Sequence, residues 1–436
     1  MLKNIKNLFA LDNPFRLLYH KLRAIIANIY YWFPSKNMTI VWVTWTNWKT
    51  TTCNIIAKWL RSSWKKVFMF STVNIILLDE EYTNETKMTS PDVFELQRLL
   101  KEAKKAWCEV AIIETASHWI KMHRIWWIQY DIVALTNITQ DHLDLHKTMD
   151  DYVKTKLEIF KNLIRYKRKK WVKKTAIVNL ESDYSELFTS ETYDNLYTYW
   201  KIWNCNLKAI NIKQTIEWTT FDVELPWKNF SINTKLRWDY NVENLLAAIW
   251  VFISFWIDQN KISQILNNIE WIPWRFEEVK NLEWIKIFID YAHTADALEK
   301  VLETLNNINK DWKIITVFWA TWDRDRIKRP VMWRVVSKLS DIVILTQDDD
   351  YSEKTEDIIS DILPWIDRIE WDNFWIISNR EEAIRTAITI ASKNDVVLIA
   401  WKWDEHTMIT NKWAIKWHDK TIVENILQWL DDNKII

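Results

Sequence analysis

One short polar run carries the residues best suited to chemistry: VWVTWTNWKTTT, from Val41 to Thr52. It follows an apolar segment that begins at Met38 and precedes a stretch with helical spacing that reaches Leu60. A strand, a loop and a helix in this order are typical of a phosphate-binding loop, whose backbone N–H groups hold phosphate oxygens. Within it, Lys49 is placed to reach the β- and γ-phosphates of a nucleotide, and Thr50 offers a hydroxyl to Mg²⁺.

Tryptophan stands where such a loop needs glycine. The chain has no glycine and 33 tryptophans in 436 residues, and ordinary globular chains contain about 7% glycine, which is close to that share. We hypothesise that the gene comes from a bacterium that decodes UGA as glycine and was translated with a table that reads UGA as tryptophan. If the tryptophans are literal, we expect crowding or distortion at Trp45, Trp48 and Trp403, because glycine φ/ψ values are costly for a residue with a Cβ atom.

Composition bounds the class of protein. A chain of 436 residues is long enough for two or three domains. Its 58 basic and 58 acidic side chains balance, which argues against a general nucleic-acid binder. Cys53, Cys108 and Cys205 are widely spaced, so the sequence predicts neither a disulfide framework nor a zinc site, and a cytoplasmic, reducing compartment is expected. The basic run from Arg165 to Lys174 favours a solvated loop over an anion-binding one.

The N-terminal segment reads as a helix. Residues Ala24 to Phe33 are too short to span a bilayer, and no signal peptide is visible. The pattern predicts an amphipathic helix that docks on the protein or on a partner, with a membrane surface as the less favoured alternative. Its apolar positions are Leu18, Leu22, Ile25, Ile26 and Ile29.

Strand-like runs alternate with helical patterns along the rest of the chain. Examples are Glu109 to Thr115, Asp131 to Asn137 and Lys174 to Leu180, and a second series follows residue 272. This alternation predicts an α/β protein with mainly parallel sheets covered by helices on both faces. We expect a helical N-terminal segment at 1–37, a central P-loop ATP-binding domain at 38–272 and a Rossmann-like α/β domain at 273–436. The active site is expected at the carboxyl ends of the strands, in the cleft between the two domains.

With Trp45 and Trp48 read as glycine, the loop becomes TGTNGKTT, and the chain resembles the Mur ligases, ATP-dependent enzymes that add amino acids to the peptidoglycan precursor. The resemblance is carried, in family order, by Thr44 to Thr51, Glu114 to Ile125, Thr136 to His146, Tyr152 to Phe160, Leu236 to Ala248, Ile272 to Val279, Asp290 to Leu302 and Trp319 to Trp333. It implies that ATP and Mg²⁺ are used to join a diamino acid, meso-diaminopimelate or L-lysine, to UDP-N-acetylmuramoyl-L-alanyl-D-glutamate through an acyl phosphate.

The resemblance also implies roles for individual residues. The implied metal ligands are Thr50, Glu114, His142 and a carbamylated Lys156, and with Lys49 the last three form the catalytic set. The implied nucleotide contacts are Thr44, Trp45, Thr46, Asn47, Trp48, Lys49, Thr50, Thr51, Asn244, Asp290 and His293. The implied substrate contacts are Thr89, Ser90, Arg124, Arg324, Asp348, Asp349, Asp350, Tyr351, Trp401 and Glu405. Taken alone, Glu114, His142 and Lys156 would read as a surface charge, a helix cap and a solvated lysine.

Some positions depart from the family pattern. Diaminopimelate-adding members usually carry Asp-Asn-Pro-Arg, whose arginine grips the distal carboxylate, where this chain has Asp348 to Tyr351. Arg368 or Arg380 could supply the missing guanidinium, so diaminopimelate is expected and lysine stays open. Ala116, Met122, Ala295 and Asp404 are further departures. Family members also have an N-terminal domain of about a hundred residues for the uridine diphosphate, whereas the P-loop strand here begins at Met38.

Two alternatives remain open at this point. A folylpolyglutamate- or cyanophycin-type ligase would share the chemistry, but the DRDRIKRP and WKWDE blocks disfavour it. A nucleotide-binding scaffold without catalysis becomes the better reading if the tryptophans are literal. We expect a monomer that binds no nucleic acid.

Overall fold

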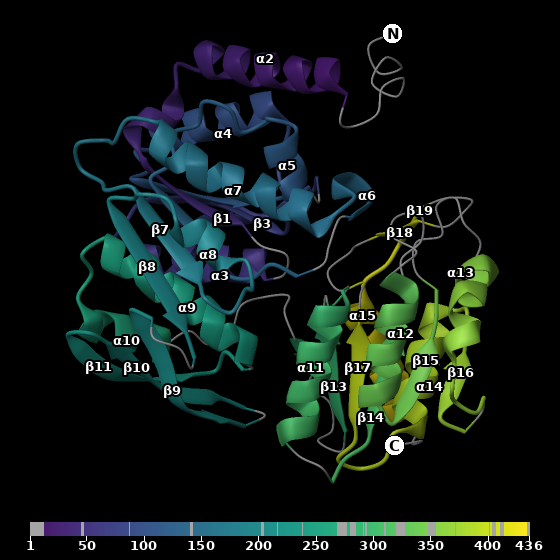
Figure 1. The fold of residues 1–436 in the computed structure, drawn as a ribbon. Coiled ribbons are helices and arrows are strands. Elements are labelled where there is room, and N and C mark those ends of the chain that lie inside the picture. The colour runs from purple at the N-terminus through teal and green to yellow at the C-terminus, as the bar shows by residue number, and fades with distance from the viewer. Residues whose placement is uncertain are drawn as a thin grey trace. The chain divides into compact units, whose positions relative to one another are not determined.

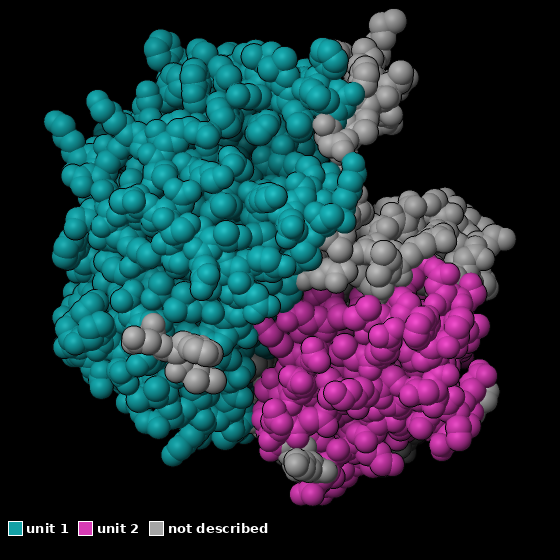
Figure 2. Space-filling view, in the orientation of Figure 1, with its two compact units in different colours: residues 1–272 teal, residues 273–436 magenta. Residues whose placement is uncertain are grey.

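The computed structural model describes residues 13–44, 48–86, 88–139, 143–201, 205–215, 217–237, 239–267, 277–279, 285–290, 292, 294–308, 311–319, 328–347, 355–370, 372–400, 402, 407–409 and 414–433. The chain divides into two compact units, Met1–Ile272 and Pro273–Ile436 (Figure 2). Each unit is an α/β structure built around its own sheet, which confirms the predicted fold class.

The first unit is built on a large mixed sheet (Figure 1). Its strands are β1 (Thr39–Thr44), β2 (Val67–Phe70), β3 (Asn74–Leu77), β4 (Glu80–Thr83), β5 (Val110–Thr115), β6 (Ile132–Leu135), β7 (Thr175–Asn179), β8 (Asn195–Trp200), β9 (Leu207–Gln214), β10 (Thr219–Leu225) and β11 (Lys228–Thr234). Their order is β11-β10-β9-β8-β7-β6-β1-β5-β2-β3-β4. The strands from β9 to β2 in this order are parallel, and both edges are antiparallel hairpins.

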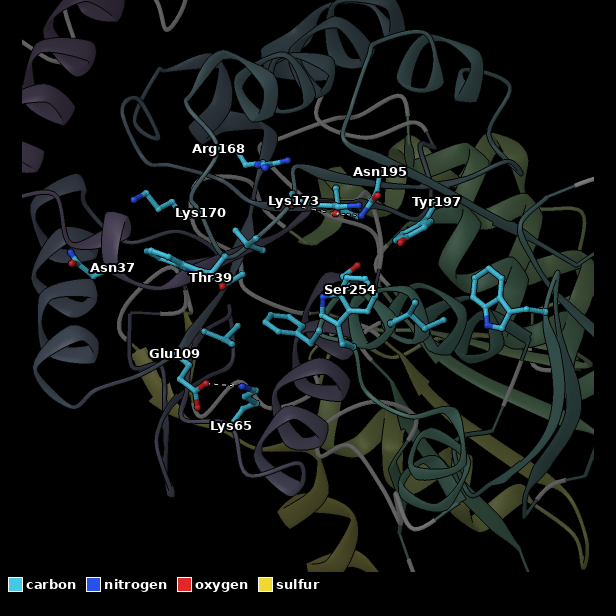
Figure 3. Close-up of a pocket in the computed structure, with 18 residues that line it drawn as sticks. Asn37, Thr39, Lys65, Glu109, Arg168, Lys170, Lys173, Asn195, Tyr197 and Ser254 are labelled. Atoms are coloured by element: carbon cyan, nitrogen blue, oxygen red, sulfur yellow. Dashed lines mark hydrogen bonds and ion pairs between the residues drawn. The ribbon is translucent and has the colours of Figure 1, made fainter.

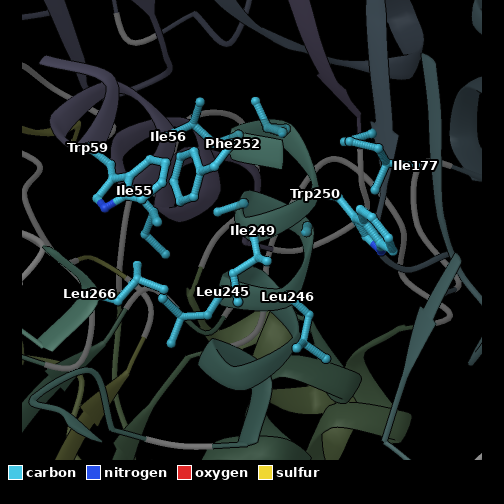
Figure 4. Close-up of a cluster of buried hydrophobic side chains, with 14 of the residues drawn as sticks. Ile55, Ile56, Trp59, Ile177, Leu245, Leu246, Ile249, Trp250, Phe252 and Leu266 are labelled. Carbon is cyan, nitrogen blue, oxygen red and sulfur yellow. The ribbon is translucent and has the colours of Figure 1, made fainter. Parts of the chain in front are cut away.

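Helices cover both faces of this sheet. They are α2 (Pro14–Tyr30), η1 (Pro34–Asn37), α3 (Lys49–Ser62), α4 (Val93–Lys105), α5 (Ser117–Lys121), α6 (Leu143–His146), α7 (Met149–Arg165), α8 (Ser185–Thr189), α9 (Asp239–Ser254) and α10 (Gln259–Asn267). The side chains of β1 alternate between two cores: Val41 and Val43 pack with α3 and α9, while Ile40 and Trp42 pack with α4 and α7. Figure 4 shows side chains of α3 and α9 in the first of these cores, among them Trp59 and Phe252. The strand is therefore buried on both faces, as parallel sheets require.

The N-terminal helix forms as predicted, but most of its apolar positions do not dock on the protein, which was one of the expected alternatives. Helix α2 contacts α4 through Ala24, Ala27 and Val93. Four of the five apolar positions singled out in the sequence are exposed instead: Leu18, Leu22, Ile26 and Ile29. No helix among the described residues is long and apolar enough to cross a membrane.

The basic run after α7 also differs from the expected solvated loop. Lys169 and Lys174 are buried, and their ammonium groups flank the buried carboxylate of Asp131 at the start of β6. Burial lowers the pKa of Lys169 and of Lys174 and raises the pKa of Asp131. The ion pairs of Lys169 and Lys174 with Asp131 hold this loop against the sheet.

Four helices of the first unit end in the same way, with tryptophan at the position just after the C-cap. These residues are Trp32, Trp64, Trp107 and Trp256, with φ between 59° and 65°. In each case the backbone N–H of the tryptophan donates to the carbonyl oxygen of the residue two positions before the C-cap. The N–H of the next residue donates to the carbonyl oxygen three positions before the C-cap, as from Lys65 to Leu60 at 2.9 Å. This is the Schellman motif, whose left-handed position is usually glycine. All four side chains are 78% to 93% exposed, so no packing holds an indole there.

The second unit contains a smaller sheet. Its strands are β12 (Glu277–Val279), β13 (Lys286–Asp290), β14 (Ile314–Phe318), β15 (Ile342–Leu345), β16 (Phe374–Ile376) and β17 (Val396–Ala400), in the order β12-β13-β17-β14-β15-β16. Only β12 is antiparallel to its neighbour. A separate hairpin joins β18 (Thr407–Ile409) and β19 (Ala414–Lys416). The helices are α11 (Ala295–Ile308), α12 (Lys328–Leu339), α13 (Thr355–Ile362), η2 (Leu363–Trp365), α14 (Arg380–Ile390) and α15 (Asp419–Asp432).

Candidate nucleotide and metal site

The P-loop region of the first unit has the predicted strand-to-helix geometry. Strand β1 ends at Thr44, whose hydroxyl lies 3.4 Å from the carbonyl oxygen of Thr115 at the end of β5. Helix α3 begins at Lys49, and its first turn buries Thr50 and Thr51. The backbone N–H groups and the positive end of the helix dipole at this terminus favour an anion such as a phosphate. Trp45, Thr46 and Asn47 lie outside the described residues.

A buried carboxylate faces the start of α3. Glu114, the penultimate residue of β5, is 1% exposed, and its Oε2 accepts a hydrogen bond from the Thr50 hydroxyl at 3.0 Å. The same oxygen accepts the backbone N–H of Thr72 at 2.8 Å, and Oε1 accepts the Thr72 hydroxyl at 2.9 Å. Glu114 is therefore no strand-end surface charge, since three donors orient its carboxylate toward the P-loop helix.

Thr72 joins this carboxylate to the segment predicted to hold substrate. Its hydroxyl lies 3.0 Å from the hydroxyl of Thr89, and the neighbouring Ser90 is buried. Within the described part of the chain the Ser90 hydroxyl has no hydrogen-bond partner. Sequence reasoning missed Thr72. The available signal was its place just after β2, because β2 and β5 are parallel neighbours whose carboxyl ends meet at one edge.

Lys156 lies inside the unit rather than in solvent. It is on α7, is fully buried, and its Nζ lies 4.8 Å from the centroid of the Tyr152 ring. Its charge also acts on His146, a buried residue at the end of α6. His146 Nε2 lies 3.0 Å from the hydroxyl of Ser117, which follows Glu114 by three residues. Lys156 is thus close to the segment that carries Glu114.

Burial governs the ionisation of two side chains around this site. Burial, helped by the positive charge of Lys121, lowers the pKa of His146 to about 4. Burial, with the nearby charge of Glu114, raises the pKa of Cys53 on α3 well above its usual range. His146 is therefore a neutral hydrogen-bonding group near neutral pH, and the Cys53 thiol is not a nucleophile.

Helix α9 brings a further predicted residue beside the loop. The ring of Tyr240 stacks on the ring of Trp48, with centroids 3.8 Å apart and planes 5° from parallel. One turn later, Asn244 is buried and donates from Nδ2 to Oδ1 of Asn241 at 3.1 Å. Trp48 itself has φ 68° and ψ 10°, in the left-handed region that favours glycine.

Arg124 lies farther along the same unit. Its guanidinium carbon is 5.9 Å from the centroid of the Trp119 ring, and burial lowers the pKa of Arg124. The charges of Asp92, Arg23 and Arg16 also act on it. Arg124 therefore lies near Asp92, which follows Ser90, and near the basic side chains of α2.

In the second unit, Asp290 is the buried last residue of β13 and pairs with Ala400, the last residue of β17. The two arginines considered for the distal carboxylate of diaminopimelate are used within the fold. Arg380 is buried against Asp419, at 2.6 Å and 2.9 Å. Arg368 donates to backbone carbonyls, among them those of Asp341 and Asn373. The expectation that either supplies the missing guanidinium is therefore wrong.

Several predicted residues lie outside the described residues, and their roles stay predictions. They are His142, His293, Arg324, Asp348, Asp349, Asp350, Tyr351, Trp401, Trp403 and Glu405.

A pocket of about 690 Å³ in the first unit lies at the amino ends of the parallel strands (Figure 3). It is lined by Thr39, Val110 and Thr175, the first residues of β1, β5 and β7. The P-loop follows the carboxyl end of β1, so this pocket is not the nucleotide site.

Comparison with known proteins identifies the family of this chain. Residues 43–252 match the Mur ligase middle domain, and residues 274–400 match the Mur ligase glutamate ligase domain. Over 413 residues, the chain is 33% identical to UDP-N-acetylmuramoyl-L-alanyl-D-glutamate--2,6-diaminopimelate ligase 1 of Clostridium acetobutylicum, covering 94% of this chain and 82% of the relative.

Solved structures show the same fold. A UDP-N-acetylmuramoyl-L-alanyl-D-glutamate--2,6-diaminopimelate ligase is similar with a TM-score of 0.63 at 26% identity, covering 90% of this chain and 79% of that one. Folylpolyglutamate synthase of Mycobacterium tuberculosis complexed with ADP has a TM-score of 0.71 at 13% identity, covering 87% and 91%, and shows the fold alone. The resemblance seen in the motifs is confirmed: the chain belongs to the Mur ligase family.

Proposed function

We propose that this protein is the cytoplasmic ATP-dependent ligase that joins a diamino acid, meso-diaminopimelate before L-lysine, to UDP-N-acetylmuramoyl-L-alanyl-D-glutamate. Mur ligases are ATP-dependent ligases, and the relative from Clostridium acetobutylicum cited above is named for this reaction. The observation that carries the proposal is the buried contact between Thr50, in the first turn of the P-loop helix, and Glu114.

The residues of this contact fit Mg²⁺. Hydroxyl and carboxylate oxygens are ligands that Mg²⁺ accepts, and two neighbouring ligands of an octahedral ion at about 2.1 Å lie about 3.0 Å apart. The oxygens of Thr50 and Glu114 are separated by 3.0 Å. Bound there, Mg²⁺ would supply charge stabilisation to the transferring phosphoryl group.

The reaction assigns work to the side chains at this site. The terminal phosphoryl group of ATP passes to an oxygen of the D-glutamate carboxylate, which leaves ADP and an acyl phosphate. The amine of the diamino acid then attacks the acyl carbon, phosphate departs with the bonding electron pair, and the nitrogen loses a proton. Lys49 and the N–H groups at the start of α3 stabilise negative charge on the phosphoryl oxygens. Thr72, Thr89 and Ser90 position the dipeptide beside Glu114.

Lys156 is proposed to act as a carbamate. Burial disfavours a charged ammonium, and Lys156 is fully buried. Reaction of its neutral amine with carbon dioxide, with loss of a proton, would replace that cation by a carboxylate-like metal ligand. Replacing Lys156 with Ala should lower turnover by orders of magnitude, with partial rescue by short carboxylic acids. Absence of rescue would contradict the carbamate.

The site also requires glycine in the loop, and we propose that the 33 tryptophans stand at glycine positions. Among the described residues, six of the twelve with positive φ are tryptophan. Trp48 is one of them, and four others are the exposed residues of the Schellman motifs. Bulky residues are genuine outliers in this region. The native protein should then be kilodaltons lighter than 53.0 kDa. An intact mass of 53.0 kDa would refute the proposal.

The proposed activity is tested by phosphate release from ATP with the glycine-bearing protein. Release should require both the muramoyl dipeptide and a diamino acid, and Lys49→Ala should reduce it by orders of magnitude. Lys104→Ala, an exposed lysine on α4, is the matched control and should leave it unchanged. Release that depends on a folate and glutamate would favour the folylpolyglutamate-type alternative, and release under no condition would favour a scaffold.

A further inference from the structure

Helix α2 carries its apolar stripe on the outside of the first unit. Phe15 is 76% exposed, and Leu18, Leu22, Ile26 and Ile29 are each about half exposed. These positions recur every three or four residues, so they form one continuous stripe along the helix. Figure 1 shows α2 lying along α4, with its other side turned away from the labelled elements of this unit. An exposed apolar patch of this kind marks an interaction surface.

The orientation of the helix is held by polar contacts on its inner face. Asn28 is buried and donates from Nδ2 to the carbonyl oxygens of Ala24, at 2.9 Å, and Trp126, at 3.1 Å. Arg23 forms an ion pair with Asp92 at 3.0 Å. Rolling the helix to bury the stripe would break these contacts and would expose Ala24 and Ala27. The stripe is therefore presented outward by the native packing.

Charge distinguishes among the partners that could cover this stripe. Between Pro14 and Tyr30 the helix has three basic side chains, Arg16, Lys21 and Arg23, and no acidic one. All three are only partly buried. Arg23 pairs with Asp92 and the Lys21 ammonium lies 4.0 Å from the centroid of the Trp126 ring, so the helix itself keeps an excess of positive charge beside the stripe. Two copies of the chain related by a twofold axis would bring these like charges together. A surface with negative headgroups and an apolar interior complements both features.

We propose that α2 is an interfacial helix that binds the surface of an anionic lipid bilayer. The apolar stripe lies at the boundary of headgroups and acyl chains, and the positive charge of the helix attracts the anionic headgroups. At 17 residues, α2 lies on the membrane rather than across it. Residues Pro14 to Tyr30 contain no tryptophan, so this proposal is independent of the glycine question and of the proposed ligase reaction.

Co-sedimentation of the full chain with vesicles tests the proposal. Vesicles of phosphatidylcholine mixed with phosphatidylglycerol should pellet the protein, whereas phosphatidylcholine alone should pellet much less. Binding should weaken in high salt because the headgroup attraction is screened. Exchanging Leu18, Leu22 and Ile26 together for serine should reduce binding by about tenfold or more, since each contributes apolar area. The exposed side chains make this variant compatible with folding, which circular dichroism and urea unfolding check.

The matched control exchanges Leu187 and Leu363 for serine, because these leucines are similarly exposed outside α2. This variant should bind vesicles as the unchanged chain does. Equal binding by the α2 variant, or absence of binding to anionic vesicles, would overturn the proposal. Light scattering after gel filtration tests whether a second copy of the chain covers the stripe instead. That result would be a dimer that the α2 variant converts to a monomer, with no vesicle binding by either protein.

Discussion

At the scale of single residues, the account depends on the carboxylate of Glu114. Thr50, in the first turn of α3, and Thr72, just after β2, both donate hydrogen bonds to it. The sequence pointed to Thr50 and Glu114 because each belongs to a recognisable block. It did not point to Thr72, because a threonine after a short apolar strand is common and only the sheet order places it beside Glu114. Lys156 and Glu114 also show why single residues mislead, since both are buried where an isolated reading expects solvent.

Thr72 offers a test of this arrangement. Thr72→Val keeps the side-chain volume and the backbone N–H but removes the hydroxyl that contacts Glu114 and Thr89. We expect kcat/KM for the dipeptide to fall by about tenfold, or roughly 1.4 kcal/mol, as for a lost hydrogen bond to a charged group. Thr72→Ser restores the hydroxyl and should recover most of the activity. A Val variant that is as active as the unchanged enzyme would remove Thr72 from the site.

His146 predicts a pH dependence of stability. Its folded-state pKa is lowered to about 4 from 6.5. Between these values the unfolded chain binds more protons, so the contribution of His146 is fully present above about pH 6.5 and is lost as the pH falls toward 4, by up to about 1.4 kcal/mol per unit. The free energy of unfolding should therefore fall less steeply over this range in His146→Gln. His418→Gln, on another unit, is the control, and parallel profiles for all three proteins would contradict the assignment.

At the scale of elements, the strand and helix pattern was predictable, but the surroundings of individual segments were not. The apolar residues of α2 predicted the helix correctly, but they did not show whether the protein or a partner would cover them. Small residues and Asn28 pack inward, which leaves the larger side chains outside. The run from Arg165 to Lys174 has seven basic residues among ten. Asp131, far away in sequence, pairs with two of them, Lys169 and Lys174, in the interior.

Asp131 should therefore matter for stability. Asp131→Asn removes the carboxylate that pairs with two buried ammonium groups, and breaking a buried ion pair in this way costs about 3–5 kcal/mol. Asp79→Asn is the control, because Asp79 forms an ion pair with Arg61 at 3.7 Å on the surface. Urea unfolding followed by circular dichroism measures both changes. A loss below 1 kcal/mol for Asp131→Asn would show that water or other groups solvate the lysines.

At the scale of the whole molecule, the family and the two-sheet architecture could be predicted from ordered blocks. The choice of amino acid could not. Asp348 to Tyr351 replace the usual motif, and the structure commits Arg368 and Arg380 to other partners. We still expect diaminopimelate to be the better substrate, because the relative from Clostridium acetobutylicum is named for it. A tenfold difference in kcat/KM requires only about 1.4 kcal/mol, so a preference for lysine would reverse this choice.

The most direct test of the central claim is mass spectrometry of the product made by the glycine-bearing protein. The reaction contains ATP, Mg²⁺, UDP-N-acetylmuramoyl-L-alanyl-D-glutamate and equal amounts of diaminopimelate and lysine. We predict a new nucleotide-linked peptide heavier than the substrate by one diaminopimelate less one water, with one ADP formed for each product molecule. A dipeptide that stays unextended while the same protein extends a folate with glutamate, or hydrolyses ATP without forming an amide, would contradict the account.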